Sequence, residues 1–486
     1  MILIIDMKIS LKIWEKIMKK FIYTTLFLIG SISIFAQNND DVEEVEVKGK
    51  VLYVDQVNSL TPPVPILDVP QSVSVVTDED IKNQGFREIS DIIRYTPGVN
   101  TSQGEGHRDA VVFRGVRSTA DFYQDGVRDD VQYYRSLYNV EQVEILRGAN
   151  ALLFGRGGTG GLINRVSKKA EIGEAFGSFD IGADSFGGSD IALDANFATS
   201  QNTAIRLNLH TDSLANHRDF YEGERYGINP TVKVQVNDDT VIDLSYEYAD
   251  HERFIDRGIP TENGAPVEAL KDVVFGTKDL NLQTLEASIL KGILSHNYSE
   301  TGKLNISVTA NDFSKLYKNL YASGYDGTLV TMDGYLDPTS RESLIFSGNI
   351  VNEFSNGSTT GTVLFGYDYL DTDNKNYRYN TFFSNTEDDN EIFKVSRPMD
   401  FSVNSDGIAS TVDYTTDLKS KSESDIEVNS LYLQGDINFN DQWKMIIGGR
   451  LETFDITVTD VKKSQAQTRE DNVFSPRFGV IYKPQE

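Results

Sequence analysis

Residues 203–210 read Thr-Ala-Ile-Arg-Leu-Asn-Leu-His, and residues 241–248 read Val-Ile-Asp-Leu-Ser-Tyr-Glu-Tyr. Apolar and polar side chains alternate in both stretches, so that Ile205 and Leu207 share one face while Arg206 faces the opposite way. Neighbouring side chains of a β-strand point to opposite faces, and the alternation therefore predicts strands with one apolar and one polar face. Segments of this kind, about ten residues long, are typical of transmembrane β-barrels, although the strands of soluble sandwiches also alternate.

About twelve such segments follow residue 170. They lie near residues 175–184, 189–198, 203–211, 226–236, 240–249, 282–293, 303–312, 342–353, 358–369, 428–439, 442–454 and 473–483. Short turns at 237–239 and 440–442 contrast with long polar stretches that we expect to be loops. These stretches are residues 213–224, 250–280, 314–340 and 370–427. Short turns at one end and long loops at the other are a property of outer-membrane barrels, and Tyr246, Tyr248 and Phe439 fit an aromatic girdle at strand ends.

The composition excludes several classes of protein. The chain has 486 residues, with 46 Lys and Arg against 73 Asp and Glu, which gives a formal net charge of −27. So acidic a balance argues against a nucleic-acid partner, because phosphate binding needs a basic face. The chain has no cysteine, which excludes disulfides, zinc–thiolate sites, iron–sulfur clusters and cysteine nucleophiles. Its 38 Gly, 23 Tyr and 26 Phe residues favour strands joined by many turns.

Residues 1–36 are predicted to be a secretory signal peptide. Lys19 and Lys20 precede an uncharged apolar run over residues 21–35, and Ala36 precedes the expected cleavage site. The run is shorter than the ~20 residues that a membrane helix needs, so a retained N-terminal anchor is the less favoured alternative. Translation is expected to begin at Met18. No later stretch resembles a membrane-spanning helix, so any later crossing of a membrane must use strands.

Two regions separate this signal from the strands. Residues 37–65 are acidic and contain prolines, and they are expected to form an extended linker. Within the linker, acids and valines alternate over residues 43–47, which suits a segment that adds as a strand to the sheet of a partner. Residues 66–170 are predicted to form a mixed α/β domain. Its expected elements are strands at 73–77, 110–114, 120–124 and 142–146 and helices at 78–84 and 89–95.

Six short motifs follow one another within this α/β domain. They read Val-Pro-Gln-Ser-Val-Ser-Val-Val-Thr at 69–77, Ile-Ile-Arg-Tyr-Thr-Pro-Gly-Val at 92–99, Phe-Arg-Gly at 113–115, Asp-Gly-Val-Arg at 125–128, Val-Glu-Ile-Leu-Arg-Gly at 143–148 and Leu-Phe-Gly-Arg-Gly-Gly-Thr-Gly-Gly-Leu-Ile-Asn at 153–164. In this order they resemble the plug domain of TonB-dependent siderophore receptors. One departure is Ala149, where the family often has proline. The resemblance implies a mixed α/β plug domain inside a transmembrane antiparallel β-barrel of 22 strands.

About 12 of those strands would fall within residues 171–486. The residues at 482–486, Tyr-Lys-Pro-Gln-Glu, look like a turn about to start another strand. The chain is therefore expected to hold the plug and the N-terminal part of the barrel of a longer protein.

The resemblance also implies a function. Members of the family are receptors in the outer membrane of Gram-negative bacteria that bind a ferric siderophore and import it into the periplasm. Energy reaches them through TonB and the inner-membrane ExbB–ExbD complex. The expected partners are therefore TonB, a ferric siderophore and outer-membrane lipid, for a protein that is a monomer without a resident cofactor. The segment expected to bind TonB is Glu43, Glu44, Val45, Glu46 and Val47. Motif details over residues 125–138 look most like catecholate receptors.

Candidate ligand-binding residues follow from their position on the outer loops of such a plug. They are Gln103, His107, Arg108, Tyr133, Tyr134, Arg135 and Tyr138. Ferric siderophores are commonly anionic and often aromatic, so arginine and tyrosine suit them by charge and by cation–π contact. Ordinary polar loops are the alternative for any one of these residues.

Two arginines in short plug strands are candidates for seating the plug. Arginines that match Arg114 and Arg147 form ion pairs with barrel glutamates in the family, and Glu452 is a candidate partner here. An unpaired guanidinium inside the barrel would be costly, which is why partners are expected. The alternative is that both are plain solvated charges.

Gly155, Gly157 and Gly160 have the spacing of a dinucleotide-binding fingerprint. That fingerprint needs a strand before the glycines and a helix after them. Residues 161–169 are too short and too rich in β-branched side chains for that helix. The glycines are instead expected to form a tight turn packed against the barrel wall.

Other chemistry finds little support. The histidines, at positions 107, 210, 217, 251 and 296, lack the spacing of metal ligands, so direct ligation of iron by the protein is disfavoured. No nucleophile–base set or carboxylate pair can be assigned, and no enzymatic activity is expected. Two other functions remain open: a TonB-dependent transporter of another scarce ligand, such as a carbohydrate or cobalamin, and a non-transporting outer-membrane adhesin rich in strands.

Overall fold

The computed structural model describes residues 56–57, 64–65, 69, 71–102, 104–148, 151–157 and 160–484, all within one unit that spans residues 53–486. The predicted signal peptide, the predicted TonB-binding segment (Glu43–Val47) and Gln103 lie outside the described residues. Among the described residues, no helix is both long and apolar enough to cross a lipid bilayer.

The N-terminal domain, called the plug below, is built on a five-stranded sheet. Its strand order is β3 (Ser72–Thr77), β9 (Val140–Arg147), β10 (Gly161–Ser167), β7 (Phe122–Gln124) and β8 (Val127–Arg128). β10 pairs parallel to β7, and the other neighbours are antiparallel. A smaller sheet joins β4 (Val99–Thr101), β5 (Val111–Phe113) and β6 (Val116–Ser118). Two-residue strands β1 (Gln56–Val57) and β2 (Val64–Pro65) pair with each other.

Two short helices complete the plug core. α2 (Asp78–Gln84) begins with a capping box between Thr77 and Asp80 and ends at Gly85, which has a left-handed conformation. α3 (Ile89–Ile93) buries three isoleucines against the strands. The predicted strands at 73–77, 110–114, 120–124 and 142–146 and the predicted helices at 78–84 and 89–95 are confirmed, with small differences at their ends.

The glycine-rich stretch does not form a dinucleotide-binding motif. α4 (Ala151–Phe154) is a helical turn where the fingerprint needs a strand, and strand β10 follows where it needs a helix. The predicted turn against the barrel wall is confirmed at Gly155. A Cβ there would lie 2.7 Å from Oε2 of Glu452 and 3.2 Å from a guanidinium nitrogen of Arg450, and its φ of 75° also favours glycine.

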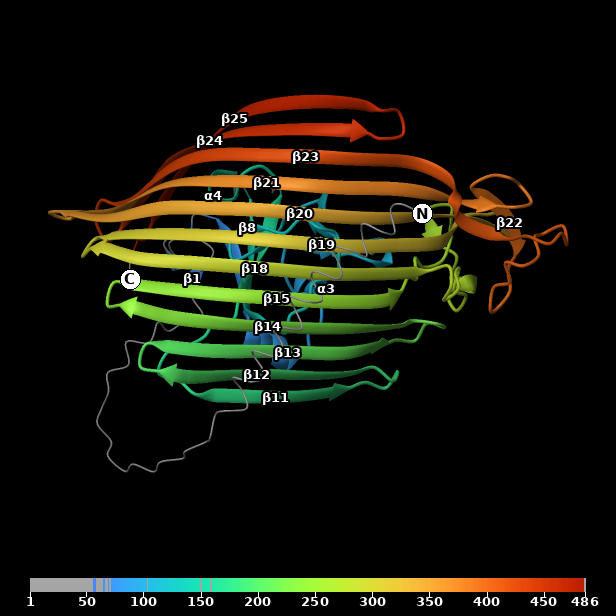
Figure 1. The fold of residues 1–486 in the computed structure, drawn as a ribbon, viewed down its shortest axis with the longest axis horizontal. Coiled ribbons are helices and arrows are strands. Elements are labelled where there is room, and N and C mark those ends of the chain that lie inside the picture. Colours follow the sequence, from blue (N-terminus) through green and yellow to red (C-terminus); the bar gives the residue numbers. More distant parts are fainter. Residues whose placement is uncertain are drawn as a thin grey trace, which may run out of the picture. The chain divides into compact units, whose positions relative to one another are not determined.

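The remaining chain forms one antiparallel sheet of thirteen strands (Figure 1). Its strands are β11 (Phe176–Ala183), β12 (Ser189–Ser200), β13 (Thr203–Ala215), β14 (Glu222–Asn237), β15 (Thr240–Phe254), β18 (Leu282–Ser299), β19 (Gly302–Tyr325), β20 (Leu329–Asn356), β21 (Thr359–Phe383), β22 (Asn390–Lys394), β23 (Val412–Asn438), β24 (Trp443–Asp460) and β25 (Gln465–Tyr482). Strands pair in sequence order, except that the short β22 pairs with β20. All twelve predicted strands are present.

The two faces of this sheet have opposite character. Arg206 and Asn208 are buried on the inner face, whereas Ile205, Leu244 and Leu433 are exposed on the outer face. A soluble sandwich would bury its apolar face, so the inverted pattern identifies the strands as those of a membrane barrel. Ion pairs and hydrogen bonds connect the inner face to the plug, whose elements lie behind the sheet in Figure 1.

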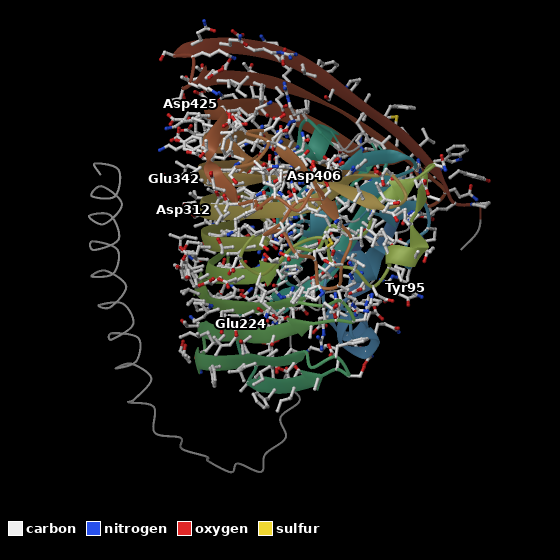
Figure 2. The ribbon with its side chains drawn as sticks, turned by 90° about the vertical axis from the view of Figure 1, so that its right-hand side faces the viewer. Tyr95, Glu224, Asp312, Glu342, Asp406 and Asp425 are labelled. Atoms are coloured by element: carbon white, nitrogen blue, oxygen red, sulfur yellow. The ribbon has the colours of Figure 1, made fainter. Side chains whose placement is uncertain are left out.

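Carboxylates form a row on the outer face near the middle of strands β19, β20, β21 and β23. Asp312 lies opposite Glu342, Glu342 opposite Asp373, and Asp373 opposite Asp425 in the strand register. Figure 2 shows Asp312, Glu342 and Asp425 on the side of the sheet that faces away from the plug. On the outer face of these four strands, the exposed apolar side chains therefore lie between this row and the short turns.

Two of the predicted loops are mostly strand. β19 and β20 run through residues 314–340 except for a three-residue turn, and most of residues 370–427 belongs to β21, β22 and β23. The expectation was wrong because polarity does not prevent strand pairing. Cross-strand hydrogen bonds satisfy the backbone in water as well as in lipid, so a barrel strand can continue beyond the membrane with polar residues on both faces. The loop predicted at 213–224 is only residues 216–221, because β13 and β14 extend into it from both sides.

The connection between β15 and β18 is a true long loop. It contains β16 (Thr261–Glu262), β17 (Ala265–Pro266) and the 3-10 turn η3 (Glu268–Leu270). Apolar side chains of this loop pack with side chains of β19, β20 and the 384–411 connection. They include Leu270, Phe275, Met332, Phe393 and Phe401. The loop end of the sheet therefore has a small core of its own.

Candidate ligand-binding site

The plug reaches the loop end of the sheet through residues 104–109, which contain the turn η2 (Gly104–Gly106). Gly106 has φ 75°, and a Cβ there would lie 2.8 Å from the carbonyl oxygen of Asp256, so only glycine fits. The Tyr317 hydroxyl donates to the carbonyl oxygen of Glu105 at 2.9 Å. The tip of the plug is therefore fixed between the β15–β18 loop and strand β19.

A group of aromatic and basic side chains surrounds this tip. We call it the apical cluster, and its members are Glu105, Arg108, Arg257, Tyr317, Tyr321, Tyr335 and Arg378. The ring centroids of Tyr317 and Tyr335 are 5.6 Å apart, and those of Tyr321 and Tyr335 are 6.4 Å apart. The Arg257 guanidinium lies 3.9 Å from the Tyr321 ring centroid, and that of Arg378 lies 4.0 Å from the Tyr335 ring centroid.

Glu105 is the acidic centre of the cluster. Its carboxylate accepts hydrogen bonds from Arg108 at 3.0 Å and from the Tyr335 hydroxyl at 2.9 Å, and Arg257 lies 3.8 Å away. Burial alone would raise the pKa of Glu105, but the guanidinium of Arg108, the Tyr335 hydrogen bond and Arg257 lower it below the ordinary value. Glu105 is therefore ionised at neutral pH and holds two arginines beside the tyrosines.

His107 lies next to the apical cluster and is buried. Its ring stacks on Tyr317 with centroids 3.8 Å apart. Burial, followed by the nearby charges of Lys315, Arg108 and Arg257, holds the pKa of His107 well below its ordinary value. The imidazole is therefore neutral at physiological pH and acts as a packed ring.

The cluster and its surroundings carry an excess of positive charge. Arg108, Arg257, Lys315 and Arg378 are four cations, and the carboxylates described near them are those of Glu105, Asp333 and Asp337. Side-chain exposure is 13% for Arg108, 18% for Arg257 and 43% for Arg378, so part of each arginine side chain reaches solvent. Tyrosine rings and accessible guanidinium groups together offer stacking, cation–π contact and charged hydrogen bonds to an anionic aromatic ligand.

The structure distributes the predicted ligand residues over three environments. Arg108 belongs to the apical cluster, and His107 stands behind it. The Tyr134 ring lies under the Arg253 guanidinium at 4.3 Å, and Tyr138 stacks on His210 with centroids 5.4 Å apart. Tyr134 and Tyr138 thus contact the inner face of β13 and β15 at the side of the plug.

Arg135 lies inside the plug, and Tyr133 lies where the plug packs against Phe313 of β19. Arg135 is fully buried and its Nε donates to Asp129 at 2.8 Å, while Nη1 lies 3.3 Å from the Asp109 carboxylate. The same Asp129 oxygen accepts from the Tyr133 hydroxyl and from Arg165. We call these five residues the plug network.

Tyr133 and Arg135 are buried, whereas the sequence suggested exposed loop positions for both. Their sequence context, a polar loop with two more tyrosines, does not reveal that Asp109, 26 residues earlier in the chain, meets the Arg135 guanidinium. A buried charge needs partners of opposite charge, and the carboxylates of Asp109 and Asp129 therefore make the burial of Arg135 possible. The ligand role of all seven residues named from the sequence stays a prediction.

Most members of the apical cluster were not predicted. Tyr317, Tyr321 and Tyr335 fall within the 314–340 stretch that was taken for a loop, and Arg257 and Arg378 fall within two other predicted loops. Tyr317 and Tyr321 are an even number of residues apart, so a strand would place both on one face, and this spacing was the available signal. The contacts to Glu105 span more than 200 residues of sequence, and this separation is why no local pattern indicated them.

The two arginines predicted to seat the plug, Arg114 and Arg147, are not seen to contact the sheet within the described residues. Arg147 donates to the carbonyl oxygen of Pro97 at 2.7 Å and to the Ser74 hydroxyl at 2.9 Å, and Arg114 is exposed. Neither forms an ion pair with a sheet carboxylate among the residues that the structure describes, so their seating role stays a prediction. Glu452 does contact the plug, through Arg156 at 3.3 Å.

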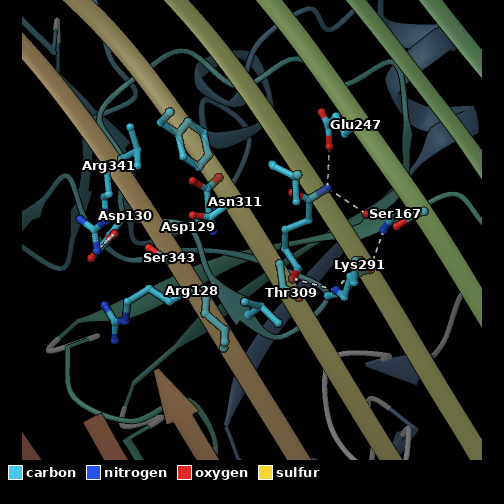
Figure 3. A pocket seen from close by; sticks show the side chains of 18 of the residues that line it. Arg128, Asp129, Asp130, Ser167, Glu247, Lys291, Thr309, Asn311, Arg341 and Ser343 are labelled. Atoms are coloured by element: carbon cyan, nitrogen blue, oxygen red, sulfur yellow. Dashed lines mark hydrogen bonds and ion pairs between the residues drawn. The ribbon is translucent and has the colours of Figure 1, made fainter. Parts of the chain in front are cut away.

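Two further ion pairs join the plug to the sheet around a small cavity of about 40 Å³ (Figure 3). Asp125 pairs with Lys291 of β18 at 2.9 Å, and Asp130 pairs with Arg341 of β20 at 2.9 Å. Burial would raise the pKa of Asp125, but the Lys291 ammonium holds it well below the ordinary value. Asp125 is therefore a carboxylate, and the contact is ionic.

No group of three or more histidine and carboxylate side chains within the described parts of the chain has the geometry of a metal site.

Comparison with known proteins gives a consistent result. Residues 65–162 match the TonB-dependent receptor plug domain, and residues 225–486 match the TonB-dependent receptor-like β-barrel. The probable TonB-dependent siderophore receptor PiuA of Acinetobacter baumannii is 26% identical over 510 residues, covering 97% of this chain and 67% of that protein. The catecholate siderophore receptor Fiu of Escherichia coli K12 is 31% identical over 233 residues, covering 46% of this chain and 30% of that protein.

A solved structure agrees with these matches. The crystal structure of the siderophore receptor PiuA from Acinetobacter baumannii aligns with a TM-score of 0.78 at 22% identity, covering 89% of this chain and 65% of that chain. The chain thus spans about two thirds of the length of PiuA.

Proposed function

The chain belongs to the TonB-dependent receptor family of outer-membrane proteins, and we propose that it acts in a receptor that binds a ferric siderophore and imports it into the periplasm. TonB would supply the energy by pairing with Glu43, Glu44, Val45, Glu46 and Val47, together with the ExbB–ExbD complex. The protein would work as a monomer, surrounded by outer-membrane lipid, without a resident cofactor. Family members are receptors and transporters, and we expect no enzymatic activity from this one.

The apical cluster carries the proposal. Three tyrosines and three arginines converge on the tip of the plug, at the end of the sheet that bears the long loops. A ferric catecholate is an anionic complex of aromatic rings, so its charge and its ring faces both find partners in such a cluster. The relative Fiu is named as a catecholate siderophore receptor, which supports the same ligand class.

The first test is iron uptake by cells that lack their own catecholate receptors. Radioactive iron supplied as a ferric catecholate should enter cells that produce the protein, and removal of TonB should abolish entry. Deletion of residues 43–47 should preserve binding and abolish uptake. Uptake that persists without TonB, or uptake of a carbohydrate or cobalamin in place of the catecholate, would contradict the proposal.

A pair of arginine variants tests the cluster itself. Arg257→Gln removes a guanidinium from the Tyr321 ring and should weaken binding of the ferric catecholate about tenfold, the value of one charged contact. Arg397→Gln is the matched control, because Arg397 pairs with Asp219 on an exposed loop away from the cluster. Equal loss of binding in both variants would mean a general electrostatic effect instead of a defined site.

A further inference from the structure

The turn between β13 and β14 extends one arginine into the β15–β18 loop. Nε of Arg218 donates to the Asp256 carboxylate at 2.5 Å. Nη2 donates to the carbonyl oxygen of Val273 at 2.8 Å, and Nη1 donates to the carbonyl oxygen of Lys271. Each guanidinium nitrogen therefore has an acceptor in the loop. Because its donors are engaged in this way, any part that Arg218 takes in ligand binding must be indirect.

Arg218 joins the two limbs of this loop. Asp256 lies at its start, just after β15 ends, whereas Lys271 and Val273 lie on its return toward β18. A long loop has many conformations when only its ends are fixed, and a contact between its limbs removes many of them. Side-chain exposure is only 11% for Arg218 and 10% for Asp256, so water would replace a lost partner poorly.

Asp256 also borders the plug and the apical cluster. A Cβ on Gly106 would lie 2.8 Å from the carbonyl oxygen of Asp256, so the tip of the plug packs directly on this backbone. The next residue, Arg257, places its guanidinium 3.9 Å from the Tyr321 ring centroid and 3.8 Å from the Glu105 carboxylate. A movement of Asp256 would therefore shift both a cation of the cluster and the surface against which the plug tip packs.

Other contacts anchor the loop as a whole. Leu270 and Phe275 are buried in the small core at the loop end, and the Asn281 amide donates to the carbonyl oxygen of Ile255 at 3.0 Å. Loss of the Arg218 guanidinium leaves these contacts in place, so the loop should stay folded. It removes the link between the start of the loop and its return limb.

From this geometry we infer that Arg218 is a positioning residue of the ligand-binding site. It fixes Asp256 between the return limb of the loop and the plug tip, and Asp256 in turn determines where Arg257 lies against the tyrosines of the apical cluster. The inference rests on the proposed function and adds to it a residue outside the apical cluster.

Hydrogen–deuterium exchange of the detergent-solubilised protein tests this positioning without any siderophore. Arg218→Gln should speed exchange several-fold over residues 255–275 and 104–109, because Asp256 loses its link to the return limb. Arg397→Gln is the matched control, since it removes the cation that pairs with Asp219 on the same turn and none of the three contacts of Arg218. No change over residues 255–275 in R218Q, or an equal change there in R397Q, would overturn the inference.

Binding measurements then separate positioning from a general structural role. The ligand is the ferric complex of 2,3-dihydroxybenzoate, and the variants are Arg218→Gln, Arg257→Gln and both together. Each single variant should bind about tenfold more weakly, and the double variant should lose no more than about tenfold, because Arg218 acts through Arg257. A loss of about a hundredfold in the double variant would overturn the inference, since the two arginines would then act independently.

A second variant covers the case in which R218Q fails to insert into the membrane. Arg218→Lys can still pair with Asp256 but lacks the planar fork that reaches both carbonyl oxygens, so it should show a smaller rise in exchange over the same residues. No rise would again overturn the inference. The exchange measurement needs no ligand. A protein that binds no ferric catecholate would therefore refute the proposed function, while exchange would still decide the role of Arg218.

Discussion

Replacing Asp109 by asparagine should change how the stability of the plug depends on pH. Asp109 is buried, and burial raises its pKa from the ordinary 3.8 to about 6, although the Arg135 guanidinium opposes the rise. Because the folded pKa exceeds the unfolded one, folding favours the protonated form of this carboxyl. Its contribution to stability is fully present below about pH 3.8 and is lost as the pH rises through about 6.

The size of the effect follows from the two pKa values. They differ by about two, and each pKa unit corresponds to about 1.4 kcal/mol, so ionising Asp109 in the folded protein costs ~3 kcal/mol above pH 6. Asparagine cannot ionise. The free energy of unfolding of Asp109→Asn, relative to the native protein, should therefore rise by ~3 kcal/mol between about pH 4 and about pH 7.

The measurement is the thermal unfolding of the detergent-solubilised protein at several pH values in that range. At each pH, the unfolding free energy of the native protein is subtracted from that of the variant. A loss of stability that the new amide causes equally at every pH does not affect how this difference changes with pH. Asp129→Asn is the matched control with the opposite sign. Burial would raise the pKa of Asp129, but Arg135 and Arg165 lower it, so that variant should be weakest near neutral pH and recover on acidification. A stability difference for Asp109→Asn that does not vary with pH would refute the reasoning.

Three further outcomes are expected. Arg135→Met removes the cation between two buried carboxylates and should lower the unfolding free energy by ~3–5 kcal/mol in thermal melts, whereas no loss would mean the carboxylates are solvated. Gly160→Ala would place a Cβ 2.5 Å from that of Phe113 and should cost ~1–3 kcal/mol in the same melts; an unchanged melt would show that the turn can move away. Tyr335→Phe removes a hydrogen bond to Glu105, so the pKa of Glu105 should rise. As the pH is lowered, the variant should therefore lose ligand affinity at a higher pH than the native protein does. A binding-versus-pH profile identical to that of the native protein would contradict this role.

Much of the fold could be predicted because side-chain periodicity is local. The alternation at residues 203–210 and 241–248 indicated strands, and the twelve predicted segments are all strands of one sheet. The ends of β19, β20 and β21 could not be placed in the same way. Their outer parts mix apolar and polar residues without a regular alternation, and buried Leu320 and Met332 pack there against a loop, so the contrast that reveals a strand inside a membrane is missing.

The candidate site was predictable only in part. Arg108 follows from its position on a plug loop, but Arg257 and Tyr335 come from segments that touch the plug only after the sheet has formed. Arg135 shows the opposite case, because its sequence context suggests an exposed side chain and the structure buries it. An arginine in a polar loop is usually exposed, and only the approach of Asp109 and Asp129 makes its burial tolerable.

The sequence by itself determined the order of the plug elements, the alternation of the strands, the acidic charge and the lack of cysteine chemistry. Each of these depends on residues close together in the chain or on composition, and neither changes when the chain folds. The tertiary structure alone decided that Glu105 gathers arginines and tyrosines around it and that Lys291 and Arg341 pair with the plug. These contacts join residues far apart in the chain, and their energies depend on burial, which exists only after the sheet and the plug have come together.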